Sequence, residues 1–178
     1  MVTERQVVDL GSLLDTMVHA GHPPATKELA QMAETLGKMF GVDPDEVAIL
    51  ALSPKSKSLK FVIPEKLSFV GTIPLTSTNA LAARTARERR SEVVNNFNAS
   101  RHATVFEAMA LGRRPGETIQ KIMSAPILDA TKVVGVVQIS RKGRSPVDAG
   151  PDFTQRDLRA LISLSPTLEM FLKLCQVE

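Results

Sequence analysis

Apolar residues recur at three- and four-residue spacing in two segments near the start of the chain. This spacing predicts an amphipathic helix over residues 4–19, which Gly21 and Pro23 end. It predicts a second helix over residues 26–40, closed by Gly41. The apolar positions are Val7, Leu10, Leu14, Met17 and Val18 in the first segment and Leu29, Met32, Ala33, Leu36 and Phe40 in the second.

Short apolar segments separated by polar turns follow these two helices. Runs of this length between turn residues are typical of strands, whereas the longer segments between them favour helices. The expected elements are strands at 47–53 and 59–64, a short strand near 67–75, a helix at 77–90, a short extended piece at 92–96 and a short helix at 102–111.

Two apolar segments rich in β-branched residues, 121–128 and 133–142, flank the polar turn 129–132. This pattern predicts an antiparallel hairpin. Along its second strand, alternation places Gln138 on the face opposite to an apolar row, and that row is expected to pack on the terminal helices. The apolar row is Val133, Gly135, Val137 and Ile139, and the other face carries Val134, Val136 and Gln138.

A capped helix is predicted after the basic loop that follows the hairpin. Thr154 stands three residues before Asp157, a pattern in which a hydroxyl and a carboxylate satisfy the free amide groups of a helix start. The helix is expected at about 154–176. Pro166 lies inside it and removes one backbone hydrogen bond, so a kink or a local break is expected there.

This order of strand, strand, loop and capped helix resembles the C-terminal half of a GAF domain, and so do the residues that carry it. Ser124 and Pro126 fit the first strand of that pattern approximately. Residues 76–96 resemble a preceding family segment, with Asn79 where family members commonly have glycine and Asn96 near a common acidic position. The matching positions are Val133, Val134, Gly135, Val136, Val137 and Lys142 in the second strand and Phe153, Thr154, Asp157, Leu158 and Leu161 at the helix start.

The resemblance implies an α+β fold of the GAF-like, PAS-related type. Such a fold has a central antiparallel sheet, with terminal helices packed on one face and a ligand pocket under short helices on the other. The resemblance covers residues from about 26 to 176 and leaves the first helix outside. We therefore expect a GAF-like domain over 25–178, preceded by an N-terminal helix and linker, 1–24, that serve dimerisation.

The composition suits a single domain of 178 residues, because hydrophobic residues make up 43% and are ample for a core. The one cysteine, Cys175, excludes an intrachain disulfide and a cysteine-rich zinc site. His19, His22 and His102 form no metal-binding pattern, so no metal is expected, and any cofactor stays unknown. Without a long apolar run or a signal-peptide core, a cytoplasmic protein with no membrane partner is expected.

The formal net charge is +3, and basic residues gather in two segments, 83–90 and 140–145. In the first, Arg84 and Arg87 share one side of the predicted helix. That side is either a phosphate-binding patch or a solvated helix face. No aromatic residues stand between the basic ones, so binding to nucleic acid is not expected.

The resemblance directs attention to the side of the sheet that carries Gln138, where the family pocket lies. A segment dense in hydrogen-bonding groups, 95–106, covers this region in the family. Its polar residues either contact a ligand or bond their own backbone in a loop and helix cap. The candidate ligand-binding residues are Asn95, Asn96, Phe97, Asn98, Ser100, His102, Phe106, Ser124 and Gln138.

The resemblance implies a regulatory domain that senses an unidentified small molecule and acts through dimerisation or a downstream signalling protein. The first alternative is a structural dimerisation module whose pocket is filled by its own side chains. The second is an enzyme of this fold. Family members that reduce free methionine sulfoxide use several cysteines around the pocket, and this chain has only Cys175, so no catalytic residue is expected.

A homodimer through the terminal helices is expected, because the apolar arc of the final helix is wider than one sheet contact needs. The first helix adds a second apolar stripe. The alternative is that the first helix folds back and covers this excess within the same chain. The arc consists of Leu158, Leu161, Ile162, Leu164, Leu168, Phe171, Leu172, Leu174 and Cys175.

Overall fold

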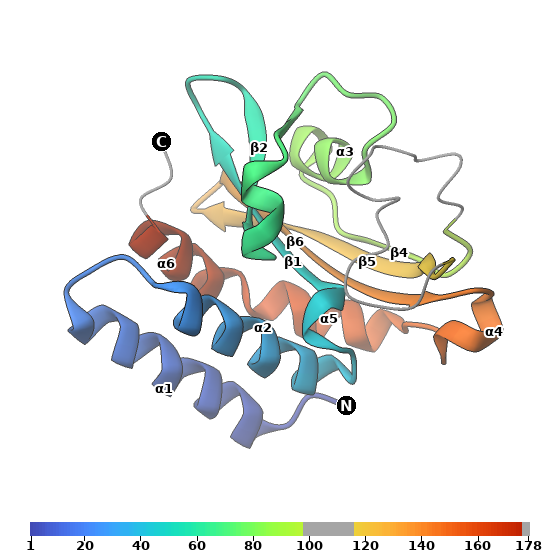
Figure 1. The fold of residues 1–178 in the computed structure, drawn as a ribbon, viewed down its shortest axis with the longest axis horizontal. Coiled ribbons are helices and arrows are strands. Elements are labelled where there is room, and N and C mark those ends of the chain that lie inside the picture. Colours follow the sequence, from blue (N-terminus) through green and yellow to red (C-terminus); the bar gives the residue numbers. More distant parts are fainter. Residues whose placement is uncertain (98–115, 176–178) are drawn as a thin grey trace.

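An antiparallel sheet, with strand order β3-β2-β1-β6-β5-β4, separates two layers of helices (Figure 1). The structure is a computed structural model that describes residues 1–97 and 116–175. The helices are α1 Glu4–Ala20, α2 Thr26–Phe40, α3 Leu81–Glu88, α4 Pro146–Ala149, α5 Gln155–Ser163 and α6 Ser165–Cys175, with 3-10 turns η1 Pro44–Glu46 and η2 Glu65–Phe69. The strands are β1 Val47–Ser53, β2 Ser58–Ile63, β3 Thr72–Pro74, β4 Glu92–Val94, β5 Thr118–Asp129 and β6 Lys132–Gly143. The expected α+β architecture is confirmed.

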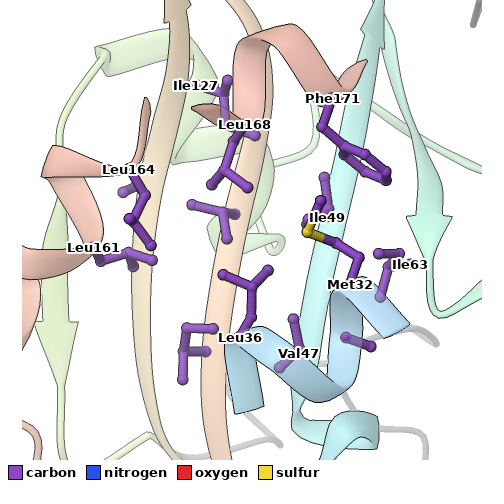
Figure 2. Packing of buried hydrophobic residues seen from close by; sticks show 14 of the residues in the cluster. Met32, Leu36, Val47, Ile49, Ile63, Ile127, Leu161, Leu164, Leu168 and Phe171 are labelled. Carbon is purple, nitrogen blue, oxygen red and sulfur yellow. The ribbon is translucent and has the colours of Figure 1, made fainter. Parts of the chain in front are cut away.

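The terminal helices α1, α2, α5 and α6 cover one face of the sheet and enclose the largest apolar cluster. In Figure 2, Met32 and Leu36 of α2 point toward Val47 and Ile49 of β1. Phe171 of α6 reaches the same cluster from the other end of the helix layer. The amphipathic spacing of these helices therefore builds the core that the sequence predicted.

Local chemistry sets the ends of the terminal helices. Capping boxes begin α1 at Thr3 and α5 at Thr154, as the sequence predicts for the latter. Gly21 and Gly41 adopt the left-handed conformation that closes α1 and α2. The expected final helix is divided at the predicted place: α5 ends at Ser163, and Pro166 stands in the first turn of α6, where its missing N–H costs no helix bond.

The opposite face of the sheet is covered by η2 and α3. Leu67 of η2 and the alanines of α3 pack there against Leu50, Phe61 and Val136. The expected short strand near 67–75 is this 3-10 turn followed by β3. The expected helix at 77–90 begins later, at Leu81, and the extended piece at 92–96 is limited to β4.

A shift of register in the β5–β6 hairpin corrects one detail of the face assignment. Ile127 pairs with Gly135 and Leu128 with Val133, so one residue of β6 is extra at this point. As a result Val133 packs against the α3-side cluster and Val134 against the terminal-helix cluster, the reverse of the simple alternation. Beyond the shift the alternation holds, since Val137 and Ile139 face the terminal helices and Val136 faces α3.

The hairpin is longer than the apolar pattern indicated, because β5 begins at Thr118. Its turn consists of two residues rather than four, with Ala130 at a φ of 53°. The short helix α4 was not predicted, and the expected helix at 102–111 lies outside the described residues. Among the described residues, no helix is long and apolar enough to span a membrane.

Candidate functional site

A chain of three buried polar side chains crosses from the sheet to α3. The amide Nε2 of Gln138 donates to Ser124 Oγ at 3.2 Å, and Ser124 Oγ lies 2.7 Å from Thr85 Oγ1. Thr85 donates its own hydroxyl hydrogen to Leu81 O at 2.9 Å, so Ser124 must donate to Thr85. The exposed fractions of Gln138, Ser124 and Thr85 are 5%, 0% and 1%.

The elements that hold this chain are regular. Ser124 and Gln138 are direct cross-strand partners in the β5–β6 ladder, so their side chains leave the sheet side by side. Thr85 lies one helical turn after Leu81, whose carbonyl oxygen it bonds. The expectation that Gln138 faces away from the terminal helices is confirmed, because its hydrogen-bonded neighbours lead to α3.

The oxygen of the Gln138 amide accepts no hydrogen bond from the described residues. Within the described part of the chain, the bond to Ser124 is the one hydrogen bond that the Gln138 side chain makes, and it uses Nε2. A glutamine offers two donors and an acceptor oxygen, and such groups nearly always find partners when they are buried. The site therefore presents an unused acceptor beside a fully used row of hydroxyls.

Two further buried polar residues continue the row along β6. Ser140 and Lys142 follow Gln138 at alternate positions and are each 5% exposed. Ser140 donates to Glu46 O at 3.2 Å, and Lys142 Nζ donates to Asp45 O at 2.9 Å. These contacts anchor η1 to β6 and give the row a fixed end.

Apolar side chains stand beside the polar row. Phe97 is 3% exposed and packs with Leu81 of α3 and with Ile119 and Ile122 of β5. Its backbone N–H donates to Gln120 O at 3.0 Å, which holds the start of the 95–106 segment against the sheet. Apolar walls with a few directed polar groups are the usual composition of a small-molecule site.

The structure brings together three of the predicted site residues, Ser124, Gln138 and Phe97, on the α3 side of the sheet. Asn95 faces the other way, since both ends of its amide bond the backbone of Phe153. Asn96 is exposed at the turn between them. The remaining candidates, Asn98, Ser100, His102 and Phe106, lie outside the described residues.

Sequence reasoning missed Thr85, Ser140 and Lys142. The sequence signal for Thr85 was its position one turn after Leu81, on the apolar side of a helix whose arginines were the candidates considered. Ser140 and Lys142 share the alternation of Gln138, but they fall in a segment that the sequence indicates as an exposed basic loop.

The arginines of 83–90 have acceptors within the protein. Arg84 pairs with Glu92 at 2.9 Å, and Arg87 donates to Leu75 O and Ser77 O. Arg89 donates to Thr131 O at 3.1 Å, and Arg90 lies 3.3 Å from Glu88. These contacts favour the structural interpretation of the segment over a phosphate-binding patch.

Three carboxylates, those of Asp43, Asp45 and Glu46, lie within 4.8 Å of one another near η1. The oxygens of Glu46 accept from the backbone N–H of Asp43 at 2.9 Å and of Lys142 at 2.6 Å. Burial raises the pKa of the Glu46 carboxyl above its ordinary value, and the bond from Lys142 partly opposes this. The geometry is therefore that of a capped turn tied to β6.

The comparisons with known proteins agree with this architecture. A model of the GAF domain family matches residues 25–170. The chain belongs to the GAF domain family. GAF domains are typically regulatory or sensory. No curated protein matched the chain.

Solved GAF structures share the fold at low sequence identity. The GAF domain of an Acinetobacter phosphoenolpyruvate-protein phosphotransferase superposes with a TM-score of 0.63 at 16% identity, covering 97% of this chain and 96% of that one. Residues 122 to 287 of a methyl-accepting chemotaxis protein give 0.62 at 14% identity, with coverages of 91% and 96%. Free methionine-R-sulfoxide reductase from Neisseria meningitidis, in complex with its substrate, gives 0.56 at 15% identity, with coverages of 99% and 95%. The fold is thus found in a domain of a phosphotransferase, in a chemotaxis protein and in a reductase.

Proposed function

We propose that this GAF domain senses a small molecule on the α3 side of its sheet, where the Gln138 amide oxygen receives a hydrogen bond from the ligand. The single observation behind the proposal is that open acceptor on a side chain only 5% exposed. A ligand that donates to this oxygen would add a hydrogen bond worth about 0.5–1.5 kcal/mol, so the site favours a molecule with an N–H or O–H group and an apolar body.

The proposal is tested by native mass spectrometry of freshly purified protein, with the Gln138→Met variant beside the wild type. A co-purified small molecule is expected on the wild type and is expected to be depleted on Gln138→Met, which keeps the bulk of the side chain and removes the acceptor together with the donor to Ser124. Gln155→Met is the matched control, because Gln155 is exposed at the start of α5. Equal retention by all three proteins would place the ligand elsewhere.

A structural module without a ligand is the second candidate, and the hydroxyl chain favours it. The hydroxyls of Ser124 and Thr85 make their hydrogen bonds to protein groups alone, so this part of the α3 side needs no ligand. This function predicts an apo mass for the wild type. It also predicts that Gln138→Met loses only the hydrogen bond from Nε2 to Ser124, about 1 kcal/mol, since no partner is lost at the oxygen.

We propose a non-catalytic role, although the fold also occurs in methionine-R-sulfoxide reductase. Cys175 packs against the terminal-helix cluster, on the other side of the sheet from Gln138. Burial raises the pKa of the Cys175 thiol to about 12, so little thiolate is present near neutral pH. A turnover lost in a folded Cys175→Ser variant would overturn this proposal.

We also propose that the domain signals through a homodimer of the terminal helices or through a downstream protein. Most of the apolar arc that motivates the dimer is buried within the chain, and α1 packs its own stripe against α2 and α6. What remains exposed on these helices is a smaller apolar set. It consists of Val7 at 45%, Val8 at 60%, Val18 at 43%, Ile162 at 45% and Met170 at 47%.

Light scattering over a dilution series tests the dimer. The expected mass is twice 19.3 kDa, and Val8→Lys, on the exposed side of α1, is expected to shift the protein toward monomer. Lys27→Ala, at an exposed position of α2, serves as the control. A monomeric wild type at high micromolar concentration would exclude the homodimer and leave the partner protein.

A further inference from the structure

The short segment 95–97 has contacts on both sides of the sheet. Phe97 packs with Leu81, Ile119 and Ile122 on the α3 side, where the proposed ligand site lies. Two residues earlier, Asn95 bonds Phe153, which belongs to the terminal-helix cluster. Only one residue separates Phe97 from Asn95, so a short stretch of backbone links a contact on the α3 side to a contact on the other face.

The contact between Asn95 and Phe153 is bidentate. Asn95 Nδ2 donates to Phe153 O at 2.9 Å, and Phe153 N donates to Asn95 Oδ1 at 2.9 Å. An amide that bonds both backbone groups of one residue fixes its orientation as well as its distance. Phe153 directly precedes Thr154, the N-cap of α5, so Asn95 positions the start of that helix.

The Phe153 ring continues the contact to α2 through Arg141. The ring is 3% exposed, and the Arg141 guanidinium lies 4.6 Å from its centroid. The same guanidinium donates to Gly41 O at 2.9 Å and to Phe40 O at 3.3 Å, at the C-terminus of α2. A cation is favourable there because it meets the free carbonyls and the negative end of the helix dipole.

The end of α2 is also the point where α1 is attached. Gln6 Nε2 donates to Lys38 O at 3.1 Å, and Gln6 is at the same time a member of the capping box that begins α1. Side chains from α1 and β6 thus satisfy neighbouring carbonyls of one helix end. Val7 and Val8, in the exposed apolar set of α1, follow Gln6 directly.

We propose that Asn95, Phe153 and Arg141 form a positioning relay that couples the α3 side of the sheet to the end of α2 and the starts of α1 and α5. The inference rests on the proposed function, because it names the route by which occupation of the ligand site reaches the terminal helices. Each step is a short directional contact between described residues. Connected polar and packed contacts of this kind carry energetic coupling between sites.

Hydrogen exchange followed by mass spectrometry on the full chain tests the relay without any ligand. The perturbation is Ile122→Val, which removes one methyl group beside Phe97. It is made in the wild type, in Asn95→Ala and in Asn96→Ala, the exposed neighbour that serves as the matched control. The reporter amides are residues 38–42 and 155–159, normalised to β2, which lies across the sheet.

In the wild type and in Asn96→Ala, Ile122→Val is expected to speed exchange at both reporters by about threefold or more relative to β2. In Asn95→Ala the added effect of Ile122→Val is expected to disappear. If Asn95→Ala does not fold, Asn95→Asp keeps the acceptor for Phe153 N–H and removes the donor, and a reduced response is expected. If Asn95 only stabilises the structure, Asn95→Ala would raise exchange at the reporters but would leave the added effect of Ile122→Val unchanged.

An unchanged response in the Asn95 variants, or no response in the wild type, would overturn the relay. Because a methyl deletion replaces the ligand, this outcome is separate from the test by native mass spectrometry. If the wild type retains a ligand but hydrogen exchange shows no relay, the sensing proposal stands and the signal leaves the site by another route. A relay in a protein without a ligand supports the structural module.

Discussion

Replacing Gly135 with alanine tests the close packing between β6, β1 and α6. An added Cβ would lie 2.4 Å from Leu50 O and 2.5 Å from Leu172 Cδ1. The oxygen belongs to the ladder of β1, which pairs with β6 at this point, and cannot move alone. The substitution therefore forces either a shift of two strands or the displacement of Leu172, which is 7% exposed.

The expected loss of stability follows from these two contacts. Overpacking of a dense core costs about 1–3 kcal/mol, and part of the burial of Leu172 is lost in addition. Together they give about 3 kcal/mol, a large share of the roughly 5–15 kcal/mol that holds a domain folded. For a chain of this length such a loss lowers Tm by roughly 6–12 °C.

Urea unfolding followed by far-ultraviolet circular dichroism measures this loss, since the chain lacks Trp and Tyr for fluorescence. Gly11→Ala is the matched control, because its Cβ would meet nothing within 4 Å in the middle of α1. That variant is expected to gain about 0.5–1 kcal/mol from helix propensity. A loss under about 1 kcal/mol for Gly135→Ala, with an unchanged denaturant slope, would refute the packing argument.

Three further substitutions or reactions have definite expected results. Burial raises the pKa of Glu46, so the contribution of this residue to stability falls as pH rises from about 4.5 through the folded-state pKa. The loss of unfolding free energy in Glu46→Gln, relative to the wild type, should therefore be smaller at neutral pH than near pH 4.5. An equal loss at both pH values would contradict this. Since burial raises the pKa of Cys175 to about 12, alkylation of the native protein near pH 8 should be on the order of a thousandfold slower than in urea, whereas similar rates would show an accessible thiolate. Thr154→Ala removes the hydroxyl that accepts from Asp157 N–H at 3.1 Å and should cost about 1 kcal/mol by urea unfolding; no loss would mean that the α5 cap is held by other contacts.

The elements that local chemistry specifies could be predicted from the sequence. The cap at Thr154, the break at Pro166 and the β5–β6 hairpin each depend on residues adjacent in the chain. The face of Gln138 was also predictable, because strand alternation is local as long as the register is regular. The exchange of Val133 and Val134 was not, since the register shift depends on how β6 meets its partner strand.

The candidate site was predicted in part for a related reason. Ser124 and Gln138 were found because cross-strand pairing places them together. Asn95 and Phe97 belong to the same polar segment of the sequence, two residues apart, and regular alternation would place them on one face of the sheet. They contact opposite sides because β4 ends at Val94 and the chain turns at residues 95–96. Thr85 reaches Ser124 only after α3 docks on the sheet, a tertiary contact that no local pattern contains.

The direction of donation in the polar chain bears on whether the α3 side is a site or a filled core. Gln138 donates a hydrogen bond to Ser124, Ser124 donates to Thr85, and Thr85 donates to the carbonyl oxygen of Leu81. The last acceptor of this chain is the carbonyl oxygen of Leu81, and its first donor, or origin, is the amide of Gln138. Among residues 1–97 and 116–175 nothing donates to the oxygen of Gln138, so within this part of the chain the network is complete at α3 and incomplete at the sheet. Leucine or methionine at 138 would fill the same space but would remove the hydrogen bond that Nε2 donates to Ser124. Under the proposed function the oxygen of Gln138 receives its hydrogen bond from a ligand, and the measured stability of Gln138→Met, set against its ligand content, separates this explanation from a packing role.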